Sequence, residues 1–214
     1  MSTTIEPPDA GAVDFFERQF RVQVAAADYA LNPFEQALLP FLSADVLDLG
    51  CGLGNLAVAA AERGCHVTAL DASPAAIADL ARRAQAQALE IEAHAAELRH
   101  YVPGRSYDTV VAIGLLMFFA CADARGLLAR LRDAVKPGGI ITLNLLIEGT
   151  TWLAPFGTEP YCLFGRNELT QAFADWEILF SRHDDFPAPG DTLKRFHTLV
   201  ARSPTRTTSP TGSR

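Results

Sequence analysis

The sequence predicts an α/β fold: a doubly wound, seven-stranded, mostly parallel sheet with a C-terminal antiparallel hairpin. Between residues 46 and 150, short apolar runs alternate with stretches of helical spacing, which is the order of repeated strand–helix units. The first apolar run closes on three glycines at alternate positions, in VLDLGCGLGNL (46–56), and such a turn opens a strand–helix unit. Near the end, the stretches 176–182 and 193–202 have no crossover helix between them, so we expect them to pair as the hairpin.

Local signals place the individual elements. Gly64 follows the first crossover helix at the position where helices end, and Ser73-Pro74 offers an N-cap followed by a proline in the first turn. The run at 109–114 is almost continuously apolar, as in a strand that is buried on both faces. The predicted strands before the hairpin are 46–49, 66–70, 91–95, 109–114 and 140–147, and the predicted helices are 54–63, 74–89, 122–134 and 167–174.

Residues 12–42 are predicted to form helices ahead of the first strand. Phe16 and Phe20 are four residues apart and therefore share a helix face. We expect such aromatic side chains to pack in the core, with a role in covering a ligand as the alternative.

A single domain is expected over 12–202, between a flexible tail at 1–11 and a disordered Ser/Thr/Pro-rich tail at 203–214.

Composition narrows the function classes. The 214 residues carry a formal net charge of −7, which speaks against a nucleic-acid partner because phosphates need a basic surface. No run of about 18 apolar residues is present, so no membrane-spanning segment is predicted. The N-terminal sequence lacks the basic and apolar parts of a secretory signal. We therefore expect a cytoplasmic protein.

The four cysteines, Cys51, Cys65, Cys121 and Cys162, are scattered along the chain. They form neither a C-x-x-C pair nor a zinc-binding spacing. We expect them to be reduced and to act as small buried apolar side chains. No metal site is predicted.

The glycine turn at 50–54 is the strongest functional signal. Glycine lacks Cβ, so it allows positive φ and lets backbone N–H groups approach a ligand closely. A dinucleotide fingerprint would read G-x-G-x-x-G, whereas this turn reads G-x-G-x-G with Asp48 before it. Asp71 closes the next strand about 20 residues after the turn, where a carboxylate can accept both hydroxyls of a ribose. A tight turn without a ligand, and an N-cap role for Asp71, are the alternatives.

The pattern D-x-G-x-G-x-G from Asp48 resembles motif I of the class I S-adenosylmethionine (SAM)-dependent methyltransferases. The resemblance implies their Rossmann-like fold, SAM as cofactor and a role for Asp48 in supporting the turn and the amino end of SAM. It also places Glu97 where an acid often accepts a hydrogen bond from the adenine amino group, with a solvated loop carboxylate as the alternative. The predicted cofactor contacts are Asp48, Gly50, Cys51, Gly52, Gly54, Asn55, Asp71, Ala72, Glu97, Leu98 and Ile113.

Residues 46–201 are further similar to the tellurite-resistance (TehB-type) methyltransferases. In that family a His-Arg pair and a further Arg precede the last strand. Here His183 stands near the His position, but the residues that follow include Asp184, Asp185 and Asp191. Carboxylates do not attract an oxyanion, which argues against tellurite as the substrate. The similarity rests on DLGCGLGN (48–55), YDTVVAIGLLMFF (107–119), KPGG (136–139), NEL (167–169), DWE (175–177) and RFHTLVAR (195–202).

Methyl transfer from a sulfonium mainly requires near-attack geometry and the exclusion of water. The aromatic loop 152–166 is expected to close the substrate side. The candidate catalytic residues are His183, as a base near neutral pH, Tyr161, and Arg166, which would bind an acidic group. For His183 and Arg166 a solvated surface position is the alternative.

We therefore expect a SAM-dependent methyltransferase that acts on a small soft nucleophile, such as a thiol or a selenium or tellurium species, because such an acceptor needs no general base. Two other functions stay open. One is methylation of an oxygen atom of a small metabolite, which would need a base. The other is a non-catalytic SAM-binding module.

Overall fold

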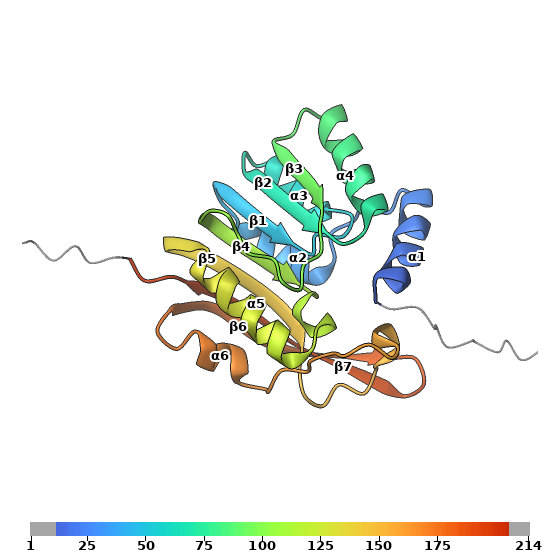
Figure 1. Cartoon of the computed structure of the whole chain (residues 1–214), viewed down its shortest axis with the longest axis vertical. Helices are drawn as coiled ribbons and strands as arrows, with labels where there is room; N and C mark the ends of the chain where they lie inside the picture. Colours follow the sequence, from blue (N-terminus) through green and yellow to red (C-terminus); the bar gives the residue numbers. More distant parts are fainter. Residues whose placement is uncertain (1–11, 206–214) are drawn as a thin grey trace, which may run out of the picture.

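The computed structural model describes residues 12–205, so the tails expected at 1–11 and 206–214 lie outside the described residues. Its centre is one seven-stranded sheet in the order β3-β2-β1-β4-β5-β7-β6 (Figure 1). Neighbours from β3 to β5 pair in parallel, whereas β7 and β6 are antiparallel, which confirms the predicted fold class. The strands are β1 (Asp45–Leu49), β2 (His66–Asp71), β3 (Ile91–Ala95), β4 (Tyr107–Ile113), β5 (Val135–Leu146), β6 (Glu177–Ala188) and β7 (Thr192–Arg202).

Helices cover both faces of the sheet (Figure 1). The predicted cap at Ser73-Pro74 forms, because Ser73 Oγ accepts the N–H of Ala76 at 3.0 Å. Asn32 caps the second helix, which was not predicted, and Asn167 at the start of the last helix makes no side-chain cap. Among residues 12–205, none of the helices has the length and apolar character needed to cross a membrane. The helices are α1 (Ala12–Ala25), α2 (Pro33–Leu38), α3 (Asn55–Ala61), α4 (Pro74–Ala86), α5 (Cys121–Asp133) and α6 (Glu168–Ala172), with short 3₁₀ helices η1 (Leu39–Phe41), η2 (Leu116–Phe118) and η3 (Ala154–Phe156).

Successive side chains of a strand point to opposite faces of the sheet, and this divides the hydrophobic core into two layers. Val110 and Ala112 of β4 pack into the cluster that contains Leu127 and Leu131 of α5. Val111, between them, packs into the cluster of α3 and α4 on the other face. The sheet is therefore buried on both faces, which explains the near-continuous apolar run of β4.

The hairpin is longer than the sequence predicted. Residues 183–191 were expected to connect two shorter strands, but β6 and β7 pair up to Ala188 and Thr192. The rings of Phe34 and Phe196 pack against Phe186 in the extension, and this tertiary contact outweighs the Pro and Gly residues of the segment. β5 also begins earlier than the predicted strand 140–147 and includes KPGG (136–139), where its register with β4 shifts between the pairs Tyr107–Val135 and Thr109–Ile140.

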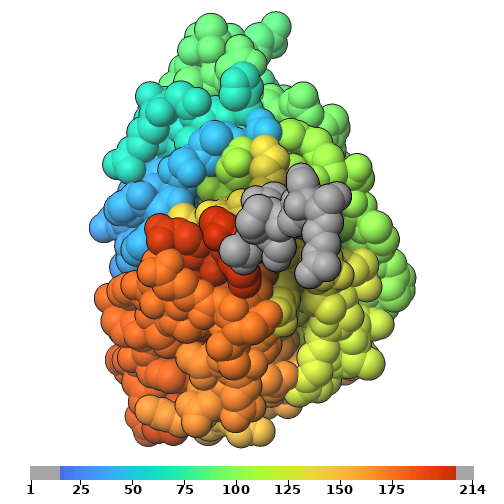
Figure 2. All heavy atoms as spheres, turned by 90° about the vertical axis from the view of Figure 1, so that its left-hand side faces the viewer, coloured from blue at the N-terminus to red at the C-terminus, as the bar shows by residue number. Residues whose placement is uncertain are grey.

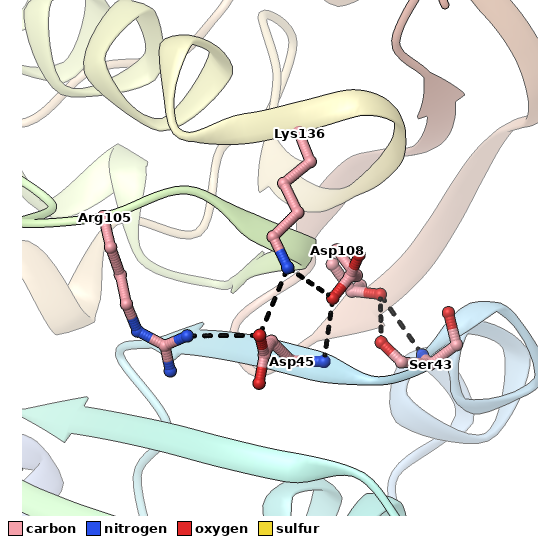
Figure 3. Close-up of polar contacts among 6 residues, drawn as sticks. Ser43, Asp45, Arg105, Asp108 and Lys136 are labelled. Carbon is pink, nitrogen blue, oxygen red and sulfur yellow. Dashed lines mark hydrogen bonds and ion pairs between the residues drawn. The ribbon is translucent and has the colours of Figure 1, made fainter.

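An ion-pair network ties the strands together at the end of the sheet where β1, β4 and β5 begin (Figure 3). Lys136 Nζ lies 3.2 Å from Asp45 Oδ2 and 2.8 Å from Asp108 Oδ2, and Arg105 Nη1 lies 3.2 Å from Asp45 Oδ2. The N–H of Asp45 donates to Asp108 Oδ2. Figure 2 faces this side of the molecule, on which segments coloured blue and segments coloured orange to red both reach the surface.

The end of the chain stays attached to the sheet slightly further than expected. Ser203 N–H donates to the Gly139 carbonyl at 2.8 Å, and Gly138 N–H donates to the Ser203 carbonyl at 3.2 Å. Ser203, which was predicted to be the first residue of the disordered tail, is therefore hydrogen-bonded to β5.

Candidate functional site

A cavity of about 1000 Å³ opens where the parallel strands end, on the side opposite the ion-pair network. This is the edge at which open α/β sheets bind ligands, and the volume suits a small molecule. The cavity has two sides. We call residues 48–56, 71–73 and 97–99 the turn side, and α1, α2 and residues 113–119, 144–159 and 194–196 the roof side.

Ten of the eleven predicted cofactor contacts line this cavity. Gly54 is not among the residues that line it. A Cβ on Gly54 would lie 2.5 Å from Leu80 Cδ2, so α4 packs too closely for any side chain there. The residues that line the cavity as predicted are Asp48, Gly50, Cys51, Gly52, Asn55, Asp71, Ala72, Glu97, Leu98 and Ile113.

The glycine turn is held by its own backbone. The N–H groups of Gly50 and Cys51 donate to the Leu70 carbonyl at 2.8 and 3.0 Å, and that of Gly52 donates to Asp71 Oδ2 at 2.8 Å. The expectation that these donors face a ligand is therefore wrong, because they tie the turn to β2. At Gly52 a Cβ would lie 3.1 Å from the Phe20 ring, so this glycine lets α1 approach the turn.

Asp48 is the penultimate residue of β1, just before the turn, and is 4% exposed. Its carboxylate lines the cavity, and among the described residues it receives no hydrogen bond. Burial raises the pKa of Asp48 to about 8, and the charges of Glu35 and Asp71 add to this rise. A buried carboxyl group without a partner favours a cationic ligand, because a cation would stabilise its ionised form.

Asp71 ends β2 and faces the cavity from the neighbouring strand. Its Oδ2 accepts the N–H of Gly52 and its Oδ1 accepts that of Ser73, both at 2.8 Å. Burial raises the pKa of Asp71 although these hydrogen bonds act in the opposite direction. Ser73 supplies the cap of α4 and donates through Oγ to Glu17 Oε1 of α1 at 2.6 Å, so Asp71 is not needed as the N-cap.

Glu97 lines the cavity but also has a local structural role. Its carboxylate accepts the N–H groups of Arg99 at 2.7 Å and His100 at 3.3 Å. The side chain is exposed, so both predicted functions, a ligand contact and a loop carboxylate, fit its position. Burial raises the pKa of the neighbouring cavity thiol, Cys51, well above its usual value, which disfavours a reactive thiolate.

The first helix covers the cavity, so the expectation that its aromatic residues pack in the core is wrong. Phe15, Phe16 and Phe20 line the cavity, and the Phe16 ring meets the ring of Phe118 at 5.2 Å between centroids. The polar residue Gln19 lies between them on the same wall. Amphipathic spacing alone does not distinguish a helix that faces a core from one that faces a cavity.

Other roof-side residues could not be assigned from the sequence. Phe34 and Glu35 reach the cavity from α2, and the Phe34 ring packs against Phe196 of β7 at 4.8 Å. Trp152 and Lys194 also line this wall, with Lys194 Nζ lying 3.9 Å from the Trp152 ring centroid. No local motif marks these positions, because they meet only through tertiary packing.

The three candidate catalytic residues, His183, Tyr161 and Arg166, are not among the described residues that line the cavity. Phe196 faces the cavity, and the next residue, His197, therefore points to the opposite face of the sheet. His183 is the cross-strand partner of His197, and the two rings stack at 4.2 Å on that opposite face. His183 Nε2 contacts the carbonyl of Arg166, and the Tyr161 ring stacks on Phe156 behind the cavity wall.

A disulfide joins Cys121, at the start of α5, to Cys162 in the loop after β5. The prediction of four reduced cysteines is therefore wrong for this pair, whereas Cys51 and Cys65 are free thiols. The N–H of Cys162 also donates to the Met117 carbonyl at 3.0 Å. These contacts hold the loop against the cavity lip, although 41 residues separate the two cysteines in the sequence.

The charges on the cavity wall are mostly negative. An environment of this kind attracts cations and disfavours anions. Within residues 12–205, the clusters of His, Cys, Asp and Glu do not include one suited to a metal ion. The carboxylates that line the cavity are Glu35, Asp48, Asp71, Glu97 and Glu159, and the cations are Arg99 and Lys194.

Comparison with known sequences identifies a methyltransferase domain, whose family model matches residues 46–139. Hemagglutinin 1 of Eikenella corrodens is 28% identical over 185 residues, which cover 82% of this chain and 59% of that protein. A ubiquinone biosynthesis O-methyltransferase of Methylocella silvestris is 30% identical over 177 residues, which cover 75% of this chain and 66% of that protein. The chain thus spans about two thirds or less of the length of these relatives.

Solved structures share the fold. TehB from Haemophilus influenzae superposes with a TM-score of 0.72 and 21% identity, over 90% of this chain and 67% of that chain. The N-methyltransferase NodS from Bradyrhizobium japonicum, solved with S-adenosyl-L-homocysteine (SAH), superposes with a TM-score of 0.70 and 15% identity, over 91% of this chain and 100% of that chain. With its glycine turn, strand-edge cavity and these relatives, the chain belongs to the class I SAM-dependent methyltransferases and has a TehB-like fold.

Proposed function

We propose that the chain transfers the methyl group of SAM to a small, uncharged acceptor with a soft nucleophile, such as a thiol. The observation that supports this acceptor class is the roof side of the cavity. Its wall is rich in aromatic rings, and no histidine is found among the described residues that line it. A soft nucleophile suits such a wall, because its methylation needs no strong base.

The turn side fits the cofactor. The unpartnered carboxylate of Asp48 suits the ammonium group of SAM, and the Asp71 carboxylate suits the ribose hydroxyls. Glu97 and Leu98 would border the adenine. Bound there, SAM supplies a methyl group that its sulfonium makes electrophilic.

The roof side would orient the acceptor and exclude water. The rings of Phe16, Phe118 and Phe34 present apolar surface to the cavity. The excess of carboxylates disfavours anionic acceptors, and tellurite is one of them. We therefore expect the resemblance to the tellurite-resistance enzymes to extend to fold and cofactor but not to the substrate.

An oxygen acceptor is a second candidate, and Glu35 favours it. This half-buried carboxylate lines the roof side, and burial raises its pKa, which brings it closer to that of a useful base. In that reaction Glu35 would take the hydroxyl proton as the carbon–oxygen bond forms.

Two measurements test the function. Isothermal titration calorimetry with SAM and SAH tests the cofactor, and SAH formation with a thiol, a phenol and tellurite tests the acceptor. We expect binding of SAM and turnover with the thiol but not with tellurite. Turnover with the phenol alone would select the oxygen acceptor, and binding without any turnover would favour the non-catalytic module. A lack of binding at millimolar SAM and SAH would overturn the cofactor assignment itself.

A further inference from the structure

Asp48 has an unusual environment for a buried carboxyl group. It is 4% exposed, it lines the cavity, and among the described residues nothing donates a hydrogen bond to its carboxylate. The nearby cation Arg83 is engaged elsewhere, because its guanidinium binds Asp79 and the Leu53 carbonyl. The structure therefore leaves a buried acid that faces the ligand space without a positive partner.

Glu35 adds a second carboxylate to the wall of the same cavity, on its roof side. Its charge adds to the rise that burial causes in the pKa of Asp48. Glu35 Oε2 accepts the N–H of Asn32 at 2.7 Å as part of a capping box, which holds the side chain in place. Packing of Phe34 on Phe196 fixes α2 to β7.

The other charged groups around this pair do not neutralise it. Asp71 of β2 and Glu17 of α1 are further acids near the turn. Two cations also line the cavity: Arg99 follows β3, and Lys194 lies over the Trp152 ring. Two carboxylates that face one cavity repel each other until a cation binds there.

We propose that Glu35 is a specificity-determining residue of the cofactor site, which together with Asp48 recognises the net positive charge of SAM and disfavours retention of SAH. The inference rests on the proposed function. SAM carries a sulfonium, an ammonium and a carboxylate and has a net charge of about +1, whereas SAH lacks the sulfonium and is neutral overall. A second carboxylate therefore stabilises bound SAM more than bound SAH. The loss of this attraction after methyl transfer favours product release.

Calorimetric titrations with SAM and with SAH test the proposal without an acceptor. Glu35→Gln removes the charge, but Gln at this position still completes a capping box, so α2 is retained. We expect its affinity for SAM to fall about fivefold to tenfold and its affinity for SAH to change less than twofold. Glu62→Gln, an exposed position outside the cavity, makes the same charge change and should leave both affinities unchanged.

Glu35→Asp separates charge from structure. It keeps the carboxylate, and we expect it to bind SAM better than Glu35→Gln does. Equal weakening of SAM and SAH by Glu35→Gln, or no weakening of either, would overturn the proposal while leaving the cofactor assignment intact. Wild-type protein that binds neither ligand would overturn the proposed function, and the role of Glu35 with it.

Discussion

The two sides of the cavity are built in different ways. On the turn side, short segments directly follow parallel strands and are joined by backbone hydrogen bonds, such as those from Gly52 and Ser73 to Asp71. The roof side assembles segments from residue 15 to residue 196, which meet mainly through side-chain packing. The difference indicates that the turn side tolerates few substitutions, whereas the residues of the roof side can vary with the acceptor.

Among turn-side substitutions, loss of the Asp71 carboxylate should cause the largest fall in SAM affinity. Asp71→Ala removes the acceptor of two backbone N–H groups, and we expect a loss of about 2 kcal/mol in stability. The affinity for SAM should fall about 100-fold, because the turn and the ribose lose the same anchor. Thermal unfolding and calorimetry measure the two effects. Wild-type affinity in this variant would show that Asp71 has no part in cofactor binding.

Asp48→Asn should weaken SAM binding but stabilise the empty protein. The pKa of Asp48 is about 8 in the folded chain, whereas an unfolded Asp has a pKa of about 3.9. Between these values the folded state binds more protons than the unfolded state, so wild-type stability falls as pH rises from about 4 to 8. Asn cannot ionise, so the stability of the variant should fall less over this pH range than that of the wild type.

We expect the Asp48→Asn variant to gain about 2 kcal/mol over the wild type at pH 8 and little at pH 4. Its affinity for SAM should fall about 30-fold. Melting curves from pH 4 to 9 and titrations at pH 8 provide the measurements. A variant that is less stable than the wild type at pH 8 would contradict the pKa assigned to Asp48.

Phe20→Ala tests how far the roof supports the turn. The ring lies over Gly52, so its removal exposes the cofactor space to water. We expect about a tenfold loss in SAM affinity and a change in stability below about 1 kcal/mol, since the residue covers a cavity and not the core. Stability loss without any effect on SAM binding would instead assign Phe20 to packing.

Removal of the disulfide should act on the roof side alone. The double substitution Cys121→Ser and Cys162→Ser opens a closed loop with a sequence separation of 41, for which chain entropy predicts a loss of about 3 to 4 kcal/mol. SAM affinity should change by no more than about twofold, because the turn side keeps its hydrogen bonds. Melting under reducing conditions should lower the Tm of the wild type but not that of the variant. A large loss in SAM affinity would show that the two sides are coupled.

His183→Ala should change SAM affinity and turnover the least. The imidazole stacks on His197 on the sheet face opposite the cavity, so SAM affinity and turnover should stay within about twofold of wild type. Steady-state assays with the active acceptor provide the readout. A pH-dependent loss of turnover would restore His183 as a candidate base.

Local sequence determined the parts of the protein that depend on neighbouring residues. Alternating strand–helix units predict the sheet, Ser73-Pro74 predicts the start of α4, and D-x-G-x-G-x-G with Asp71 predicts the cofactor edge. The predictions of the sheet and of the start of α4 succeed because strands, caps and turns depend on contacts over short stretches of chain. Asp71 could be placed because parallel strands bring their carboxyl ends to one edge.

Tertiary structure alone decided the roof side. The meeting of Glu35 and Asp48 in one cavity, the disulfide between Cys121 and Cys162, and the face to which His183 points all depend on segments that are far apart in the sequence. A shift of one residue in strand register reverses the face on which a side chain lies, and sequence spacing does not reveal that register for the hairpin. The cofactor edge is therefore encoded locally, whereas the acceptor wall exists only once the whole chain has packed.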